Sequence, residues 1–115
     1  MSYDIYLYEK EFLDRALAED LGDWTGADPI PAEKLQLIRD RLTSKGYVTE
    51  DGREFGHPNS KWGLQVALFS GEVSFSIPYW DDVATAVEAA RADAMELATI
   101  ANLGFYDPQI GETAT

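Results

Sequence analysis

An alternating apolar segment that turns back on itself is the feature that most constrains the fold of this chain. Apolar and other residues alternate over 64–69 and again over 73–77, with Ser70-Gly71 between them. A period of two on both sides of a short turn predicts an antiparallel β-hairpin. Another element must cover one face of this hairpin, because extensive apolar surface is unfavourable in water. That face carries Leu64, Val66, Leu68, Val73, Phe75 and Ile77.

The segment 81–103 is predicted to form the covering helix. Asp81 is a suitable N-cap for it, and Gly104 is expected to end it. The apolar residues of the segment recur every three or four positions, as in the buried stripe of an amphipathic helix. They are Val83, Val87, Ala90, Ala94, Leu97 and Ala101.

The other segments predict further strands and helices. Residues 3–9 alternate with large side chains on both faces, which favours a strand that is central or covered on both sides. Helical spacing predicts two more helices, over 11–21 and 31–45. Short strands are expected over 47–49 and over 105–107, where Pro108 is expected to block further pairing.

Together these elements predict one domain over 1–115, of the α/β (α+β) class. We expect a two-layer sandwich in which about three helices cover a mixed, mostly antiparallel sheet of four or five strands. If the first and last strands are neighbours in that sheet, Asp4 and Asp107 lie near each other and Tyr-Asp pairs can tie the chain ends together.

The charge of the chain restricts its partners. Twenty-one acidic residues oppose nine basic ones, which gives a net charge of −12. The excess lies in residues 1–30 and 61–115, whereas residues 31–60 are balanced. Such a field repels phosphate groups and attracts basic proteins, so we expect a basic protein partner and neither nucleic acid nor an anionic membrane. The alternative is that the acidity serves solubility only.

Location and cofactors follow from what the sequence lacks. No segment approaches the roughly 20 apolar residues of a membrane span, and the N-terminal segment has no basic region, so a cytoplasmic location is expected. Without Cys the chain has no disulfide, thiolate metal site or Cys nucleophile. With one His, and glycine spacing that matches no phosphate-binding loop, we expect no metal, no cofactor and no enzymatic activity.

His57 is the one residue from which an enzymatic alternative can be built. It shares a loop with Ser60, which could act as a nucleophile, but no third group is specified by the spacing. Because His57 precedes Pro58, as is typical of a turn, its presence in the loop needs no catalytic role.

Two acidic segments are candidates for partner binding. In the helix predicted over 81–103, Asp82, Asp93 and Glu96 lie opposite the apolar stripe, and Arg91 is the only base. This pattern indicates either a docking surface for a basic partner or a solvated helix face. In the loop before residue 30, Trp24 lies between glycines with Asp23 and Asp28 nearby, which is typical either of an interface anchor or of a plug over the helical layer. The aspartate spacing does not match a calcium loop.

The ends of the chain carry a resemblance. The segments Ser2-Tyr3-Asp4-Ile5-Tyr6 and Leu103-Gly104-Phe105-Tyr106-Asp107-Pro108-Gln109, with the hairpin running into Trp80, resemble a group of small bacterial proteins. These proteins begin with an SYD-type strand and end with a long helix and a GLxxYDPQ-type strand. The resemblance covers about half of the chain and implies a toxin-immunity protein, which binds and neutralises a toxin. It implies no catalytic residues.

Three hypotheses follow. The first is an immunity protein that masks a basic toxin surface through Trp24, Asp23, Asp28, Asp82, Asp93 and Glu96. The second is a non-catalytic self-assembly or regulatory interaction domain. The third is a small enzyme that uses His57.

Overall fold

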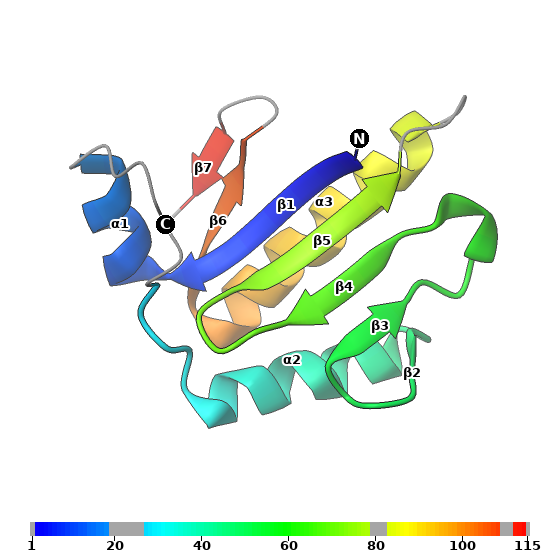
Figure 1. Ribbon diagram of the computed structural model, residues 1–115, viewed down its shortest axis with the longest axis horizontal. Helices are drawn as coiled ribbons and strands as arrows, with labels where there is room; N and C mark the ends of the chain where they lie inside the picture. The colour runs from blue at the N-terminus through cyan, green and yellow to red at the C-terminus, as the bar shows by residue number, and fades with distance from the viewer. Residues whose placement is uncertain (1, 19–26, 79–82, 109–111, 115) are drawn as a thin grey trace.

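The computed structural model describes residues 2–18, 27–78, 83–108 and 112–114 (Figure 1). Strands and helices follow one another along the chain, with a single turn of 3-10 helix at Ser60–Trp62. The elements are β1 (Ser2–Glu9), α1 (Lys10–Ala18), α2 (Ala32–Ser44), β2 (Val48–Thr49), β3 (Glu54–Gly56), β4 (Gln65–Leu68), β5 (Val73–Pro78), α3 (Val83–Ala101), β6 (Leu103–Asp107) and β7 (Glu112–Ala114).

The strands form one seven-stranded sheet in the order β2-β3-β4-β5-β1-β6-β7. Every neighbouring pair is antiparallel. The predicted fold class and hairpin are confirmed, and so is the pairing of the first strand with the strand over 105–107, since Leu7 lies opposite Phe105. Because β3 and β7 were not predicted, the sheet is larger than expected.

The prediction that Pro108 blocks further pairing is wrong. Strand β6 does end at Asp107, but the chain returns as β7 and pairs with it, with Tyr106 opposite Thr113. Proline removes a donor only at its own position, so it ends a strand without preventing a later segment from pairing with that strand.

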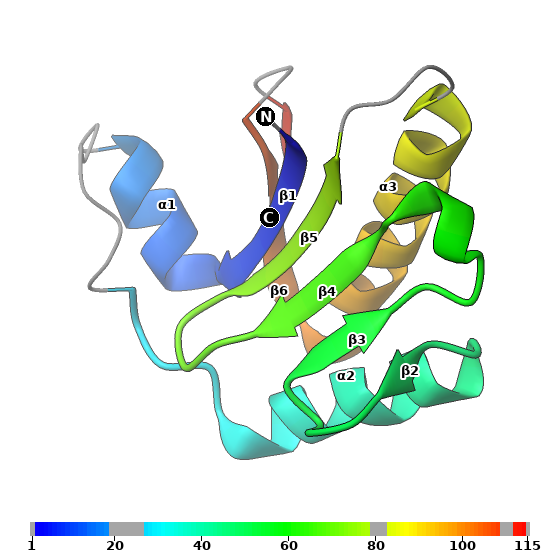
Figure 2. The ribbon, with the colours of Figure 1, turned by 45° about the vertical axis from the view of Figure 1, so that its right-hand side comes forward.

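The main core lies between one face of the sheet and the two helices α2 and α3 (Figure 2). Phe55, Val66, Phe75 and Ile5 lie side by side across four strands, and each is at most 2% exposed. From α3, the buried residues Ala90, Ala94 and Leu97 pack against this row of side chains, as the predicted stripe requires. The small alanines let the helix approach the sheet closely.

A second, smaller cluster covers part of the other face. Side chains alternate along β1, so Leu7 points into the main core while Tyr8 points to the opposite side. There Tyr8 packs with Phe12, Leu13 and Ala16 of α1. Figure 2 shows α1 and α3 on opposite sides of the sheet. Strand β1 therefore lies inside the sheet, as its large side chains predicted, and α1 covers its second face at Tyr8.

The end of α3 differs from the prediction. The helix stops at Ala101 rather than running to residue 103, and Asn102 takes the left-handed conformation with φ of 55°. Asparagine tolerates this conformation better than other residues with a side chain, so it can end a helix in place of glycine. Gly104, the predicted end, instead lies in β6 opposite Tyr8.

A buried carboxylate joins the two ends of the chain. Asp107 is fully buried, and its Oδ2 accepts hydrogen bonds from the Tyr3 hydroxyl at 2.6 Å and from Arg91 Nη1 at 2.5 Å. Arg91 also lies over the ring of Phe105, 5.6 Å from its centre. One charge thus holds β1, α3 and β6 together. Burial and the Asp107 carboxylate raise the pKa of Tyr3 to about 12, so its hydroxyl stays protonated as a donor.

We predict that Asp107→Ala costs about 3 kcal/mol of unfolding free energy, because it leaves a half-buried arginine and a half-buried hydroxyl without this acceptor. Urea unfolding of the variant and the wild type measures the difference. The matched control is Asp40→Ala, which removes an exposed carboxylate bound to Gln36 and should change stability by less than about 0.5 kcal/mol. Equal losses in the two variants would show that the buried carboxylate does not hold the strands together.

Candidate functional site

One face of the sheet is left largely without a covering helix. Opposite the main core, and beyond α1, two rows of side chains run across the strands, and all of them are exposed or half-buried. Most are small or polar, and we call this surface the open face. One row is Glu54, Ala67, Ser74, Tyr6 and Tyr106; the other is Val48, Gly56, Gln65, Ser76 and Asp4.

The open face ends in an acidic and apolar corner at β2 and β3. We define the β2–β3 corner as Val48, Glu50, Asp51, Glu54 and Phe69. Two neighbouring pockets of about 360 and 240 Å³ share Asp51 and Glu54 as lining residues. Val48 is 67% exposed and Phe69 is 50% exposed, more than any other large apolar side chain in the described ranges. Apolar side chains ringed by acids form a surface suited to protein recognition.

Backbone hydrogen bonds stabilise the ionised carboxylate of Asp51 at the centre of the corner. Asp51 accepts hydrogen bonds from the backbone N–H groups of Glu54 and Arg53, at 2.9 and 2.8 Å, and these bonds lower its pKa. Within the part of the chain that the structure describes, no ion pair joins Glu50, Asp51 or Glu54 to a base. Two bases lie nearby without pairing in the described ranges: Arg53 lines the smaller pocket with Asp51 and Glu54, and Arg39 donates to the carbonyl oxygen of Gly52. The corner therefore keeps carboxylates without a described ion pair, and neighbouring bases offset part of their charge.

The predicted acidic stripe on α3 has a different environment. Asp93 accepts a hydrogen bond from the Tyr47 hydroxyl at 2.7 Å and lies 3.1 Å from Lys45 Nζ. Glu96 lies 3.2 Å from the same ammonium group and 3.4 Å from Arg41 Nε. The helix itself carries only Arg91, so the bases that pair with these acids come from α2 and the residue that follows it.

The limited exposure of Asp93 and Glu96 also indicates that they make contacts within the fold. The side chain of Asp93 is only 15% exposed, and that of Glu96 is 38% exposed. Burial, followed by the hydrogen bond to Asp93, raises the pKa of Tyr47 well above its usual range. The two described acids of the stripe thus stabilise the contact between α2 and α3, and a role for them in partner binding stays a prediction.

The residues predicted in the first loop are only partly described. Asp28 lies 3.1 Å from Arg15, and both side chains are more than 40% exposed. Such a surface pair contributes about 0–1 kcal/mol, so Asp28 is available to a competing base. Asp23, Trp24 and Asp82 lie outside the described residues.

His57 is held by its own loop. Its Nδ1 accepts a hydrogen bond from the Asn59 N–H at 2.9 Å, and its ring packs against Tyr47 and Trp62, with centres 5.1 and 4.5 Å apart. The two pockets at the β2–β3 corner and the pocket at the end of α3 are lined by other residues. These contacts give the imidazole a packing role that requires no reaction.

The described ranges contain neither a cluster of metal-ligating side chains nor a membrane-spanning helix. No group of three His, Asp or Glu side chains there could hold a metal ion. None of the helices described is both long enough and apolar enough to cross a membrane.

Sequence reasoning missed the β2–β3 corner for two reasons. Strand β3 has only three residues, which are too few to show a period in the sequence. The second reason concerns Phe69. If Leu64, Val66 and Leu68 face the core, alternation places Phe69 on the outer face, and this signal was available in the sequence.

Comparison with known proteins adds no relative: no family model matches the chain, and no match is found among curated proteins or solved structures.

We predict that His57 titrates below its usual pKa of about 6.5, because burial disfavours the charged imidazole. The unfolded chain then binds the proton more tightly, so stability should fall as the pH drops below 6.5 towards the folded pKa. The ring proton resonances of this one His report its midpoint by NMR, and the chain in urea is the reference. A folded midpoint at or above that of the unfolded chain would contradict the packed environment.

Proposed function

We propose that this chain is a binding protein that presents an acidic surface to a basic protein partner. The observation that carries the proposal is the distribution of its charges. Among the described residues, five basic side chains form ion pairs within the chain, and none of these pairs involves the β2–β3 corner. They are Arg15, Lys34, Arg41, Lys45 and Arg91. Unpaired acids therefore adjoin the most exposed apolar side chains.

This combination favours a protein partner over other classes. Val48 and Phe69 offer apolar area for burial, and the acids around them would steer a basic surface into place. The net charge of −12 repels phosphate backbones and anionic lipids. It also opposes the pairing of two copies through the same face, which disfavours a self-assembly domain.

The specific form of the proposal is an immunity protein that neutralises a basic toxin by direct binding in the cytoplasm. It rests on the resemblance of the chain ends to small bacterial proteins of that kind. Binding would block the toxin by covering its basic surface, so no catalytic residue is required. A role for His57 in catalysis is disfavoured by its contacts within the loop.

The test is capture of a partner from the host by the tagged protein, with washes at low and high salt, followed by kinetics with the purified partner. We expect a stoichiometric basic protein whose association rate falls as salt rises. Self-association without a basic partner at low salt would overturn the proposal in favour of an assembly domain.

Reversing charges at the β2–β3 corner tests whether this corner is the docking site. We predict that Glu50→Lys with Glu54→Lys slows association at least about tenfold and leaves the melting temperature nearly unchanged, since both residues are exposed. The matched control is Glu11→Lys with Asp14→Lys on exposed positions of α1, which changes the net charge equally. Equal slowing in the two variants would show that only total charge matters and that the corner is not the docking site.

A further inference from the structure

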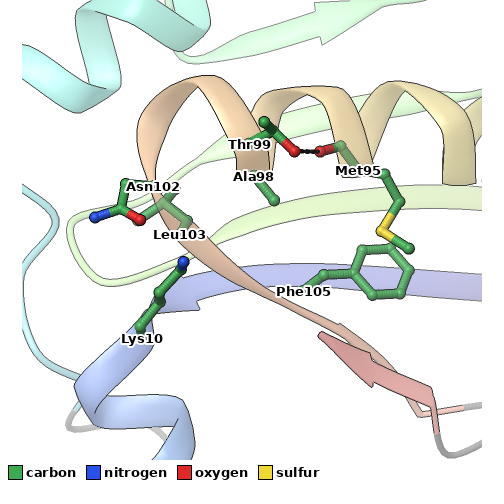
Figure 3. A pocket seen from close by; sticks show the side chains of 7 residues that line it. All are labelled: Lys10, Met95, Ala98, Thr99, Asn102, Leu103 and Phe105. Carbon is green, nitrogen blue, oxygen red and sulfur yellow. Dashed lines mark hydrogen bonds between the residues drawn. The ribbon is translucent and has the colours of Figure 1, made fainter. Parts of the chain in front are cut away.

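A pocket lies at the edge of the sheet opposite to the β2–β3 corner. It is formed by the last turns of α3, the start of β6 and the first residue of α1 (Figure 3). Its volume of about 370 Å³ falls at the lower end of the range of small-molecule sites, roughly 300–1,000 Å³. No residue of the β2–β3 corner lines this pocket.

The floor of the pocket is apolar and fixed. Leu103 and Phe105 of β6 are at most 2% exposed, and Ala98 of α3 is 7% exposed, so each is held by the main core. Met95 forms a wall of the pocket and is 37% exposed. A thioether side chain adapts to the shape of a small apolar group. The floor and this wall can therefore receive a short aliphatic chain.

The rim of the pocket carries donors instead of acids. Lys10 is half-buried, and Figure 3 shows its amine directed towards Asn102 and Leu103. In the described part of the chain, Lys10 forms no ion pair. Its neighbour Glu9 is paired with Lys34 instead, at 2.9 Å. Among the described residues, no carboxylate pairs with the Lys10 ammonium group, although the chain has more than twice as many acids as bases.

Asn102 places a second donor on the rim. Its left-handed backbone, with φ of 55°, turns the chain from α3 into β6. Its backbone oxygen accepts a hydrogen bond from Lys34 at 3.2 Å. Figure 3 shows the exposed side-chain amide with its oxygen towards Leu103 and Lys10 and its nitrogen on the far side. A half-turn of the amide brings its two N–H donors to the rim, where they can bind a ligand. The hydroxyl of Thr99 is already used, because it donates to the Met95 carbonyl oxygen at 2.9 Å.

We propose that this pocket binds a small organic monoanion with a short aliphatic tail. The carboxylate lies at the rim, where the Lys10 ammonium group pairs with it and the Asn102 amide donates to it. The tail lies on Leu103 and Phe105, against Met95. The net charge of the chain repels anions, so selectivity for an anion must come from the two donors at the rim.

Methyl NMR with three six-carbon probes tests the proposal. Hexanoate, hexan-1-ol and hexylamine share a tail and differ in charge, and the chain has only two methionines, so the Met95 methyl signal is easily assigned. We expect hexanoate to shift this signal saturably and to bind more tightly than hexanol, with hexylamine weakest. Each methylene that fits should tighten binding by up to about fourfold, which heptanoate and octanoate measure.

A pair of variants separates the charge from the tail. Lys10→Gln should weaken hexanoate binding about two- to fivefold and leave hexanol binding unchanged, because only the carboxylate pairs with the ammonium group. Lys61→Gln changes the net charge equally on an exposed lysine that does not line the pocket, and it should have no effect. The proposal is overturned if hexanoate gives no saturable shift, if hexylamine binds as tightly, or if the two variants behave alike.

Discussion

The Asp107 carboxylate is the group on which the arrangement of the other elements depends. A fully buried charge is tolerated only when donors surround it, and here the donors come from β1 through Tyr3 and from α3 through Arg91. Because Asp107 ends β6, these contacts fix the first strand, the long helix and the last part of the chain relative to one another. They also place β1 near the centre of the sheet, with α3 on one face and α1 on the other. The open face is the part of the sheet that neither α3 nor α1 covers in this arrangement.

Most of the fold could be predicted because its main elements are long enough to show a period. The hairpin over 64–77 and the helix ending at Ala101 carry their apolar residues at regular intervals, and the structure buries those faces. Strands β3 and β7 have three residues each, so only their partners in the sheet define them. The helix end at Asn102 was missed because glycine is the commoner residue in that conformation and Gly104 lies close by.

The candidate site was less predictable, because charges are neutralised in space and not along the sequence. Asp93 and Glu96 have few bases near them in the sequence, yet Lys45 and Arg41, about fifty positions earlier, lie against them. Glu50 and Glu54 have Arg53 beside them in the sequence and form no described ion pair with it. Local charge patterning therefore does not show which acids are paired within the fold. The exposed position of Phe69 was available from strand alternation, whereas that of Val48 required the register of β2 with β3.

The central claim is that acidic side chains form ion pairs between α2 and α3, whereas those of the β2–β3 corner have no described ion pair. The most direct test is to compare how a cationic and an anionic nitroxide enhance the NMR relaxation of each backbone amide proton, because their ratio reports the local electrostatic potential. Among the described residues, the amides of 48–56 should show a more negative potential than those of 93–96. The most negative potential at 93–96 would contradict the account, since it would mean that the ion pairs with Lys45 and Arg41 do not neutralise the helix in solution.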